Sequence, residues 1–100
     1  MKSLRDPKRK PTHPGELLRE DVLPALKMSQ SELAKRLGVS RLSVSELLLE
    51  KRAMSPDMAV RIGRLTNTTP DSWLRMQTAI DLWALERDPK RYRHIEPVAA

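Results

Sequence analysis

Two short helices are predicted very close together in the segment MSQSELAKRLGVSRLSVSELLLEKR, which spans residues 28–52. Ser29 is placed to cap the first helix, and Glu32 stands three residues later, which is the pattern of a capping box. Ser40 is placed to cap the second helix, directly after Gly38 and Val39. Helices of about seven or eight residues are marginal when isolated in water, so something other than core building must set this close spacing.

A tight turn that contains glycine joins these two helices, and this arrangement describes a helix-turn-helix. Gly38 can adopt the positive φ angle that such a turn needs, and Ala34 is small where the helices must approach each other. Apolar side chains stand where the two helices would meet each other and a preceding helix: Leu33, Leu37, Val44 and Leu47. A plain corner of two helices that binds nothing has the same spacing, so this alternative stays open.

The rest of the chain predicts an all-α fold of five helices with a long C-terminal helix. The first helix opens near Pro14, and Pro24 ends or bends it. The fourth helix begins after Ser55 and reaches about residue 65, and the fifth covers residues 70–87 until Asp88-Pro89 breaks it. No stretch alternates with period two, so we predict no sheet.

The chain divides into three predicted regions. Residues 1–11 form a basic disordered arm, residues 12–87 form one helix-turn-helix domain with its motif at 29–49, and residues 88–100 form a C-terminal tail. The arm carries most of the net charge of +6, which favours an anionic partner or only improves solubility. The chain has no cysteine and no apolar run near ~20 residues, and no apolar segment follows the basic residues 1–10. We therefore expect no signal peptide, a cytoplasmic location and no membrane contact.

The second helix of the motif has one apolar face and one mixed face. Winding it at about 100° per residue gathers Val44, Leu47 and Leu48 into a buried stripe. The opposite face collects the remaining side chains, with Arg41 projecting from the first turn: Leu42, Ser45, Glu46 and Leu49. Because an exposed leucine can pack on thymine methyl groups, this face predicts entry into the major groove of DNA.

The segment SQSELAKRLGVSRLSVSELLLEKR resembles the helix-turn-helix of the lambda-repressor-like (XRE) regulators, in which a glutamine stands early in the first helix of the pair. The resemblance implies that Gln30 contacts a DNA phosphate. It implies that the base-facing residues are Arg41, Leu42, Ser45 and Glu46. Lys51 and Arg52 follow as phosphate contacts, and Ser43, a groove residue of the same helix, is predicted as a further one.

A longer part of the chain is similar to the HigA family of antitoxins, also labelled virulence-associated protein I. The similarity covers residues 12–87 through the segments HPGELLREDVL, LAKRLGVSR, SPDMAVRIGRLTNTTPDSWLRMQ and DLWALER. It implies a sequence-specific DNA-binding antitoxin of a type II toxin-antitoxin module, which represses its own promoter and neutralises a HigB-like endoribonuclease toxin. The family usually has an Asn-Gly-like turn where this chain has Leu49-Glu50, which predicts that the helix before it runs a residue or two further.

The last predicted helix is apolar on two sides. One side gathers Met76, Ile80, Trp83 and Ala84, and we expect Trp73, Ile80 and Trp83 to pack in the core of the protomer. The other side carries the predicted interface of a homodimer that reads a palindromic operator: Leu74, Leu82 and Leu85. A single core that covers both sides is the alternative.

Catalysis, a metal and a cofactor are not expected. His13 and His94 are far apart, Glu20 and Asp21 point about 100° from each other on a helix, and the serines lack a nearby histidine. Two other functions stay open: a stand-alone XRE repressor without a toxin, and a protein-interaction module that does not read DNA.

Overall fold

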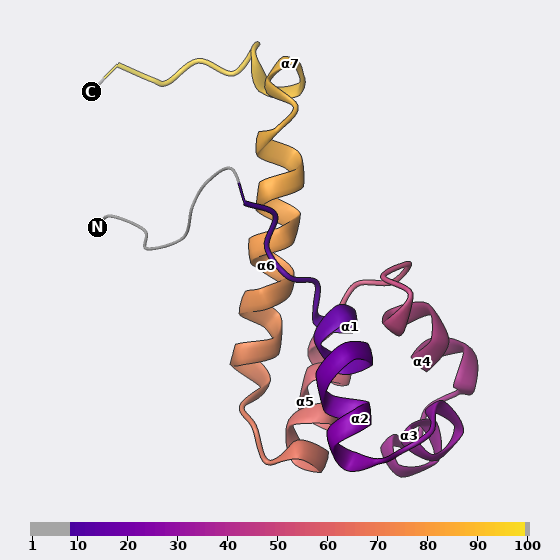
Figure 1. The fold of residues 1–100 in the computed structure, drawn as a ribbon. Helices are drawn as coiled ribbons and strands as arrows, with labels where there is room; N and C mark the ends of the chain where they lie inside the picture. Colours follow the sequence, from indigo (N-terminus) through magenta and orange to yellow (C-terminus); the bar gives the residue numbers. More distant parts are fainter. Residues whose placement is uncertain (1–8, 100) are drawn as a thin grey trace.

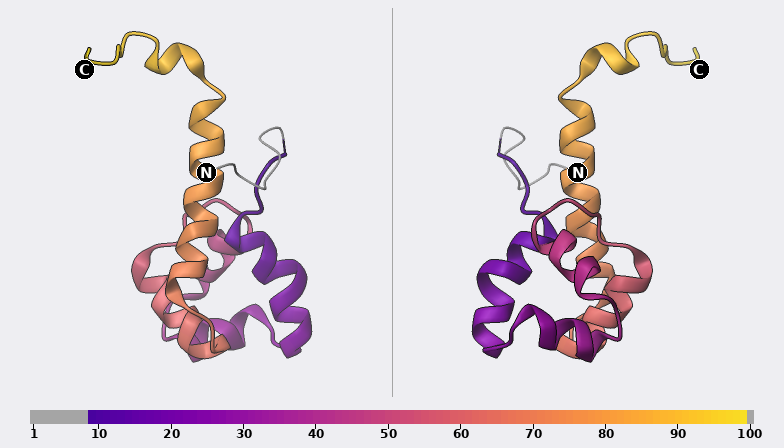
Figure 2. Two further views of the ribbon diagram at one scale, coloured as in Figure 1. Left: turned by 90° about the vertical axis from the view of Figure 1, so that its left-hand side faces the viewer. Right: turned by 90° about the vertical axis from the view of Figure 1, so that its right-hand side faces the viewer.

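The computed structural model describes residues 9–99, and in that range the chain forms helices and no strand. Residues 1–8, which make up most of the predicted arm 1–11, and residue 100 lie outside the described part. Several short helices gather in a bundle, and the long helix α6 (Pro70–Glu86) runs along one side of it and projects beyond it (Figures 1 and 2). None of the helices within residues 9–99 is long and apolar enough to cross a membrane.

The first helical stretch consists of three consecutive elements. These are α1 (Pro14–Leu17), the π-helical turn η1 (Leu18–Val22) and α2 (Leu23–Leu26). Of the two predicted effects of Pro24, the helix end is wrong, because the stretch continues through Pro24 to Leu26. The regular winding is interrupted only by the π-helical turn that precedes the proline. In the wide π turn the N–H of Leu23 donates to the carbonyl of Leu18, five residues earlier. This looser winding just before Pro24 accommodates a residue that cannot donate and whose ring would crowd the preceding turn.

The two helices of the predicted motif are α3 (Gln30–Leu37) and α4 (Arg41–Leu48). The Oγ atom of Ser29 accepts from the N–H of Glu32 at 3.1 Å, and Gly38 follows α3 with a φ of 70°. The Oγ atom of Ser40 accepts from the N–H of Ser43 at 3.0 Å. Both predicted caps and the left-handed glycine are therefore confirmed.

The end of α4 differs from the prediction. The helix does not run further than Leu48, because Leu49 leaves the helical conformation and Glu50 takes a φ of 62°. The N–H of Glu50 bonds the carbonyl of Leu47 at 3.0 Å, and that of Lys51 bonds the carbonyl of Glu46 at 2.8 Å. Glu50 thus makes the left-handed turn that a glycine or asparagine makes more easily.

The C-terminal half contains α5 (Pro56–Thr66), α6 and α7 (Pro89–Tyr92). The side chains of Ser55 and Thr69 cap α5 and α6, and each helix has a proline in its first turn, as predicted. The helix end at Asp88-Pro89 is also confirmed, but the predicted tail contains the short helix α7. Pro89 has the φ angle of a first helical residue, which explains this extra turn.

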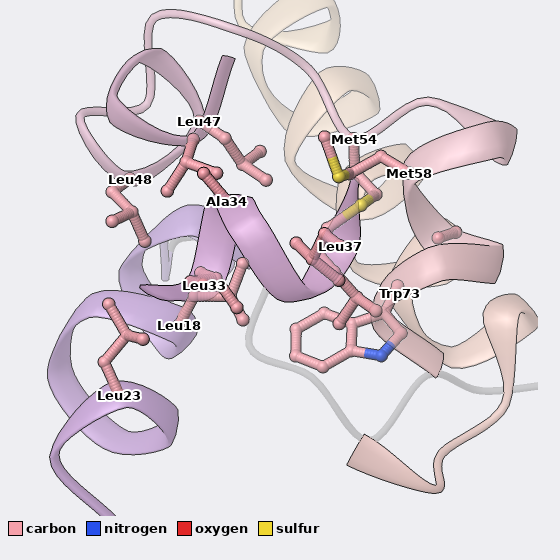
Figure 3. Close-up of a cluster of buried hydrophobic side chains, with 13 residues drawn as sticks. Leu18, Leu23, Leu33, Ala34, Leu37, Leu47, Leu48, Met54, Met58 and Trp73 are labelled. Atoms are coloured by element: carbon pink, nitrogen blue, oxygen red, sulfur yellow. The ribbon is translucent and has the colours of Figure 1, made fainter. Parts of the chain in front are cut away.

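One apolar core holds the bundle together, and Figure 3 shows its side chains pointing toward one another from α1–α2, α3, α4 and the C-terminal half. The most deeply buried side chains include Leu18, Val44, Leu48 and Ile62. Two residues of α6 depart from the prediction. Ala84 is exposed, and Trp83 is only half-buried and lies outside this cluster.

Gln77 is a buried polar residue that the sequence pattern did not place in the core. Its Oε1 atom accepts from the backbone N–H of Met54 at 2.8 Å, in the loop between α4 and α5. Because an unpaired buried N–H is costly, the amide side chain there is more favourable than an apolar one. Gln77 therefore ties α6 to the loop that follows α4.

Candidate nucleic-acid interface

Helix α4 is supported from behind by α1 and α3. Its stripe Val44, Leu47 and Leu48 is buried, as predicted. Gly15 of α1 lies so close to the backbone of Leu47 that a Cβ atom at this position would overlap with the Leu47 carbonyl group. This packing leaves the other face of α4 at the surface of the molecule.

The predicted base-facing residues lie on that open face. Arg41 is exposed in the first turn of α4, and Leu42 is 67% exposed. Ser45 and Glu46 are half-buried. An apolar side chain that is two-thirds exposed gains only a small part of its burial free energy from the protein itself, which is compatible with a partner that offers methyl groups.

Three of the predicted contact residues form one hydrogen-bonded group. Arg52 donates from Nη2 to Oε1 of Glu46 at 2.9 Å and from Nη1 to Oγ of Ser43 at 3.0 Å. The Oγ atom of Ser43 also lies 2.8 Å from Oγ of Ser40, the cap of α4. The guanidinium group therefore lies across one turn of α4 and is connected to its N-terminus.

The other predicted phosphate contacts are separate from this group. Gln30 is exposed at the first position of α3, and Lys51 is exposed in the turn after α4. The N-terminal turns of α3 and α4 carry the positive ends of the helix dipoles, which favour phosphate groups. No hydrogen bond within residues 9–99 engages the side chain of Lys51.

Two arginines that the sequence pattern did not single out fix the ends of the motif. Arg61 donates from Nη1 to the carbonyl of Leu37 at 2.7 Å and from Nε to Asp57 at 2.8 Å, so it closes the end of α3. Arg19 donates from Nη1 to the carbonyl of Leu48 at 2.6 Å, at the end of α4. The spacing of Asp57 and Arg61 signals their ion pair, but no local pattern signals a bond over the 24 residues to Leu37.

His13 has a structural environment rather than that of a metal ligand. It is buried, and its Nδ1 atom accepts from the N–H of Gly15 at 2.9 Å, which caps α1. Burial lowers the pKa of His13, and this effect outweighs the nearby carboxylates of Glu50 and Asp81. Residues 9–99 contain no group of three or more side chains that could hold a metal ion.

The predicted dimer residues lie on α6. Leu82 is 47% exposed and Leu85 is 37% exposed, whereas Leu74 is half-buried and packs partly on the core. Leu74 and Leu82 line a shallow hollow of about 450 Å³ on α6 together with Arg75 and Ala79. The exposed leucines and the hollow together form an apolar area on the surface of α6.

The chain matches the family model described as Helix-turn-helix (HTH_3) over residues 18–73. It is 42% identical to the uncharacterised transcriptional regulator YbaQ of Escherichia coli strain K12, over 91% of this chain and 83% of that protein. It is 40% identical to virulence-associated protein I of Dichelobacter nodosus, over 87% of this chain and 81% of that protein. It is 32% identical to antitoxin HigA-1 of Vibrio cholerae, over 80% of this chain and 75% of that protein.

Solved structures of antitoxins share the fold. The Pseudomonas aeruginosa antitoxin HigA with the higBA promoter aligns with a TM-score of 0.80 and 36% identity, over 89% of this chain and 99% of that one. The antitoxin GraA in complex with its operator aligns with a TM-score of 0.84 and 36% identity, over 98% of this chain and all of that one, a coverage of 100%. The chain therefore belongs to the Helix-turn-helix (HTH_3) family of XRE-type proteins and, within it, to the HigA and virulence-associated protein I antitoxins.

Proposed function

We propose that this protein is a sequence-specific DNA-binding antitoxin that acts as a homodimer, represses its own promoter and neutralises a HigB-like endoribonuclease toxin. The observation that carries the DNA-binding part is the open face of α4, which is held out by α1 and α3 and presents Arg41 and Leu42. The antitoxin structures with promoter and operator DNA, which have the same fold, support it. A repressor that binds a bacterial promoter acts in the cytoplasm, and we propose this location for the protein. Binding to DNA requires no catalytic residue, and we propose none.

The proposed contacts divide into two classes. Arg41, Leu42, Ser45 and Glu46 of α4 face the bases, where arginine pairs with guanine and leucine packs on a thymine methyl group. The proposed phosphate contacts fix the register of the helix in the groove but carry no sequence information: Gln30, Ser43, Lys51 and Arg52.

The size of a DNA site supports the proposed homodimer. One helix-turn-helix reads few base pairs, and two copies read a palindrome when their recognition helices lie roughly 34 Å apart. We place the interface on α6, at Leu74, Leu82 and Leu85, because Leu82 and Leu85 are exposed and because Leu74 and Leu82 line an open hollow. Burying this surface against a second copy would remove it from water.

The toxin partner is supported by the antitoxin relatives and by no particular residue of this chain. A stand-alone XRE repressor would have the same DNA contacts without a toxin, and an interaction module would lack DNA binding altogether. We favour the antitoxin because the named relatives that align over most of the chain include HigA antitoxins.

Two measurements test the proposal. Fluorescence anisotropy at a fixed salt concentration should give tighter binding to the upstream region of the protein's own gene than to a shuffled sequence of the same composition. Equal affinity for the two would contradict sequence-specific repression.

Coexpression with the product of the adjacent small open reading frame tests the toxin part. An antitoxin should form a stable complex with that product and restore the growth of cells that express it. Operator binding without such a complex would identify a stand-alone repressor. If the protein neither binds the operator nor forms the complex, both the antitoxin and the repressor are contradicted.

A further inference from the structure

Glu46 is an unusual residue for a surface that approaches DNA. Phosphate groups repel a carboxylate, and a carboxylate can only accept hydrogen bonds. Its place on the open face of α4 therefore needs a donor on the partner and a positive charge beside it. The structure supplies the charge through Arg52, which lies 2.9 Å from Oε1 of Glu46.

The chemistry of the major groove limits what Glu46 can accept from. Guanine and thymine present acceptors at their groove edges, and adenine presents an amino group beside the acceptor N7. Cytosine presents its N4 amino group as a donor. A carboxylate on a recognition helix therefore matches a C·G pair better than the other three arrangements.

Arg52 also fixes where the Glu46 carboxylate lies. Ser43 and Glu46 are three residues apart on α4, so they lie on one face of the helix, and Arg52 bonds both. The guanidinium holds Oε1, and within residues 9–99 Oε2 of Glu46 has no hydrogen-bond partner. Oε2 is thus the atom that remains to accept from a base.

We propose that Arg52 is a positioning residue that holds the Glu46 carboxylate for the amino group of one cytosine in each half-site. The inference rests on the proposed function, in which α4 enters the major groove. It gives Arg52 a role in sequence preference beyond its predicted phosphate contact. Two of the five N–H donors of the guanidinium serve Ser43 and Glu46, so the others can still reach the backbone of the DNA.

The test is a set of binding curves for operators in which each base pair of one half-site is replaced in turn by the other three. The wild-type protein should prefer C·G at one position by roughly 5- to 150-fold, the range for a good side chain–base pair. In Arg52→Ala that preference should fall to less than about threefold, while the preferences at the other positions persist.

Lys51→Ala is the matched control. It removes the same charge from the neighbouring exposed position, whose side chain makes no bond to Glu46. The backbone N–H of residue 51, which donates to the Glu46 carbonyl, is kept in this variant. Its affinity should fall for all sequences alike, and its preference for C·G should stay at the wild-type value. If Arg52→Ala and Lys51→Ala give the same profile, Arg52 contributes only charge and the proposal is overturned.

Two further variants separate positioning from charge. Arg52→Lys keeps the positive charge but cannot bridge Ser43 and Glu46 with a planar fork, so it should lose most of the C·G preference. Full retention of that preference would contradict the positioning role. Glu46→Gln should move the preference at the same position toward A·T, since a glutamine amide pairs with adenine.

The outcomes also separate this proposal from the proposed function. If the wild-type protein does not distinguish its own upstream region from shuffled DNA, the proposed function fails first. If it does distinguish them but Glu46→Gln leaves every base preference unchanged, only the role of Glu46 and Arg52 is wrong. Circular dichroism of each variant checks that the helices are retained.

Discussion

Gly15 lies directly against the backbone carbonyl group of Leu47, so the N-terminal helical stretch supports α4 through backbone contact. A side chain at residue 15 would have to displace the backbone of the helix that we propose reads DNA. The position of α4 against α1 therefore depends on a glycine, which has no side chain, at residue 15.

Gly15→Ala should lower the free energy of unfolding by about 3 kcal/mol or more, because the clash is with backbone that cannot rotate away. Urea denaturation measures the change. Gly38→Ala is a useful comparison, since its φ of 70° costs about 1–2 kcal/mol while the nearest atom is the end of the Arg61 side chain. Equal effects of the two changes would show that α1 can move away from α4 at little cost.

Arg41→Ala should reduce operator affinity by an amount on the order of 1–3 kcal/mol and relax the preference at one position of each half-site. The reason is the exposed position of Arg41 in the first turn of α4, from which it can reach the edge of a guanine. Competition binding with single-base operator variants measures this effect. Gln30→Ala should weaken all sequences alike, and an unchanged sequence preference in Arg41→Ala would place α4 outside the groove.

The stability of the protein should decrease in mild acid. Burial lowers the pKa of His13 below its ordinary value of 6.5, so the unfolded state binds the proton more tightly than the folded state. The free energy of unfolding should therefore fall as the pH drops from about 6.5 through the pKa of the folded state. Thermal unfolding across this pH range measures the decline.

His13→Asn isolates that contribution. Asparagine keeps an acceptor at the N-cap of α1 and does not titrate, so the variant should lose less stability than the wild type between about pH 6.5 and pH 5. The control is His94→Asn, which changes the exposed histidine of the C-terminal segment and should leave the decline as it is. Identical pH profiles for all three proteins would assign the acid sensitivity to other groups.

Leu82→Glu should convert the proposed dimer to a monomer, keep its helicity and abolish tight operator binding. A charge in a desolvated interface is costly, whereas the same charge on an exposed face is nearly neutral. Sedimentation velocity and circular dichroism measure the two properties. Val60→Glu is the matched control, because Val60 of α5 is 44% exposed and Leu82 is 47% exposed. A Leu82→Glu protein that stays dimeric would move the interface away from α6.

The positions of the helices could be predicted because their signals are local. Ser29, Ser40, Ser55 and Thr69 each accept from a backbone N–H three residues later, so the bond that starts each helix needs no distant residue. The buried stripe of α4 could be predicted for a similar reason, since its spacing follows from the pitch of the helix.

Two predictions about helix ends were wrong, and they show which features local sequence signals do not determine. Pro24 is tolerated because a π turn precedes it, and Glu50 takes a left-handed conformation that its side chain does not favour. Arg19 holds the turn at Glu50, because its guanidinium bonds both the Leu48 carbonyl at the end of α4 and the Glu50 carboxylate. Propensity is a small energy, and tertiary contacts of similar or larger size override it.

The sequence by itself determined the order of the helices, their caps and the two faces of α4. Only the tertiary structure decided that Arg52 joins Glu46 and Ser43, that Gln77 serves the backbone of Met54, and that Arg61 closes α3. The physical reason is range. A cap or a helical stripe depends on residues within one or two turns, whereas the partners of Gln77 and Arg61 lie 23 and 24 residues away. Arg52 is close to Glu46 and Ser43 in the sequence, but it reaches them only because the left-handed turn at Glu50 directs the chain back along α4.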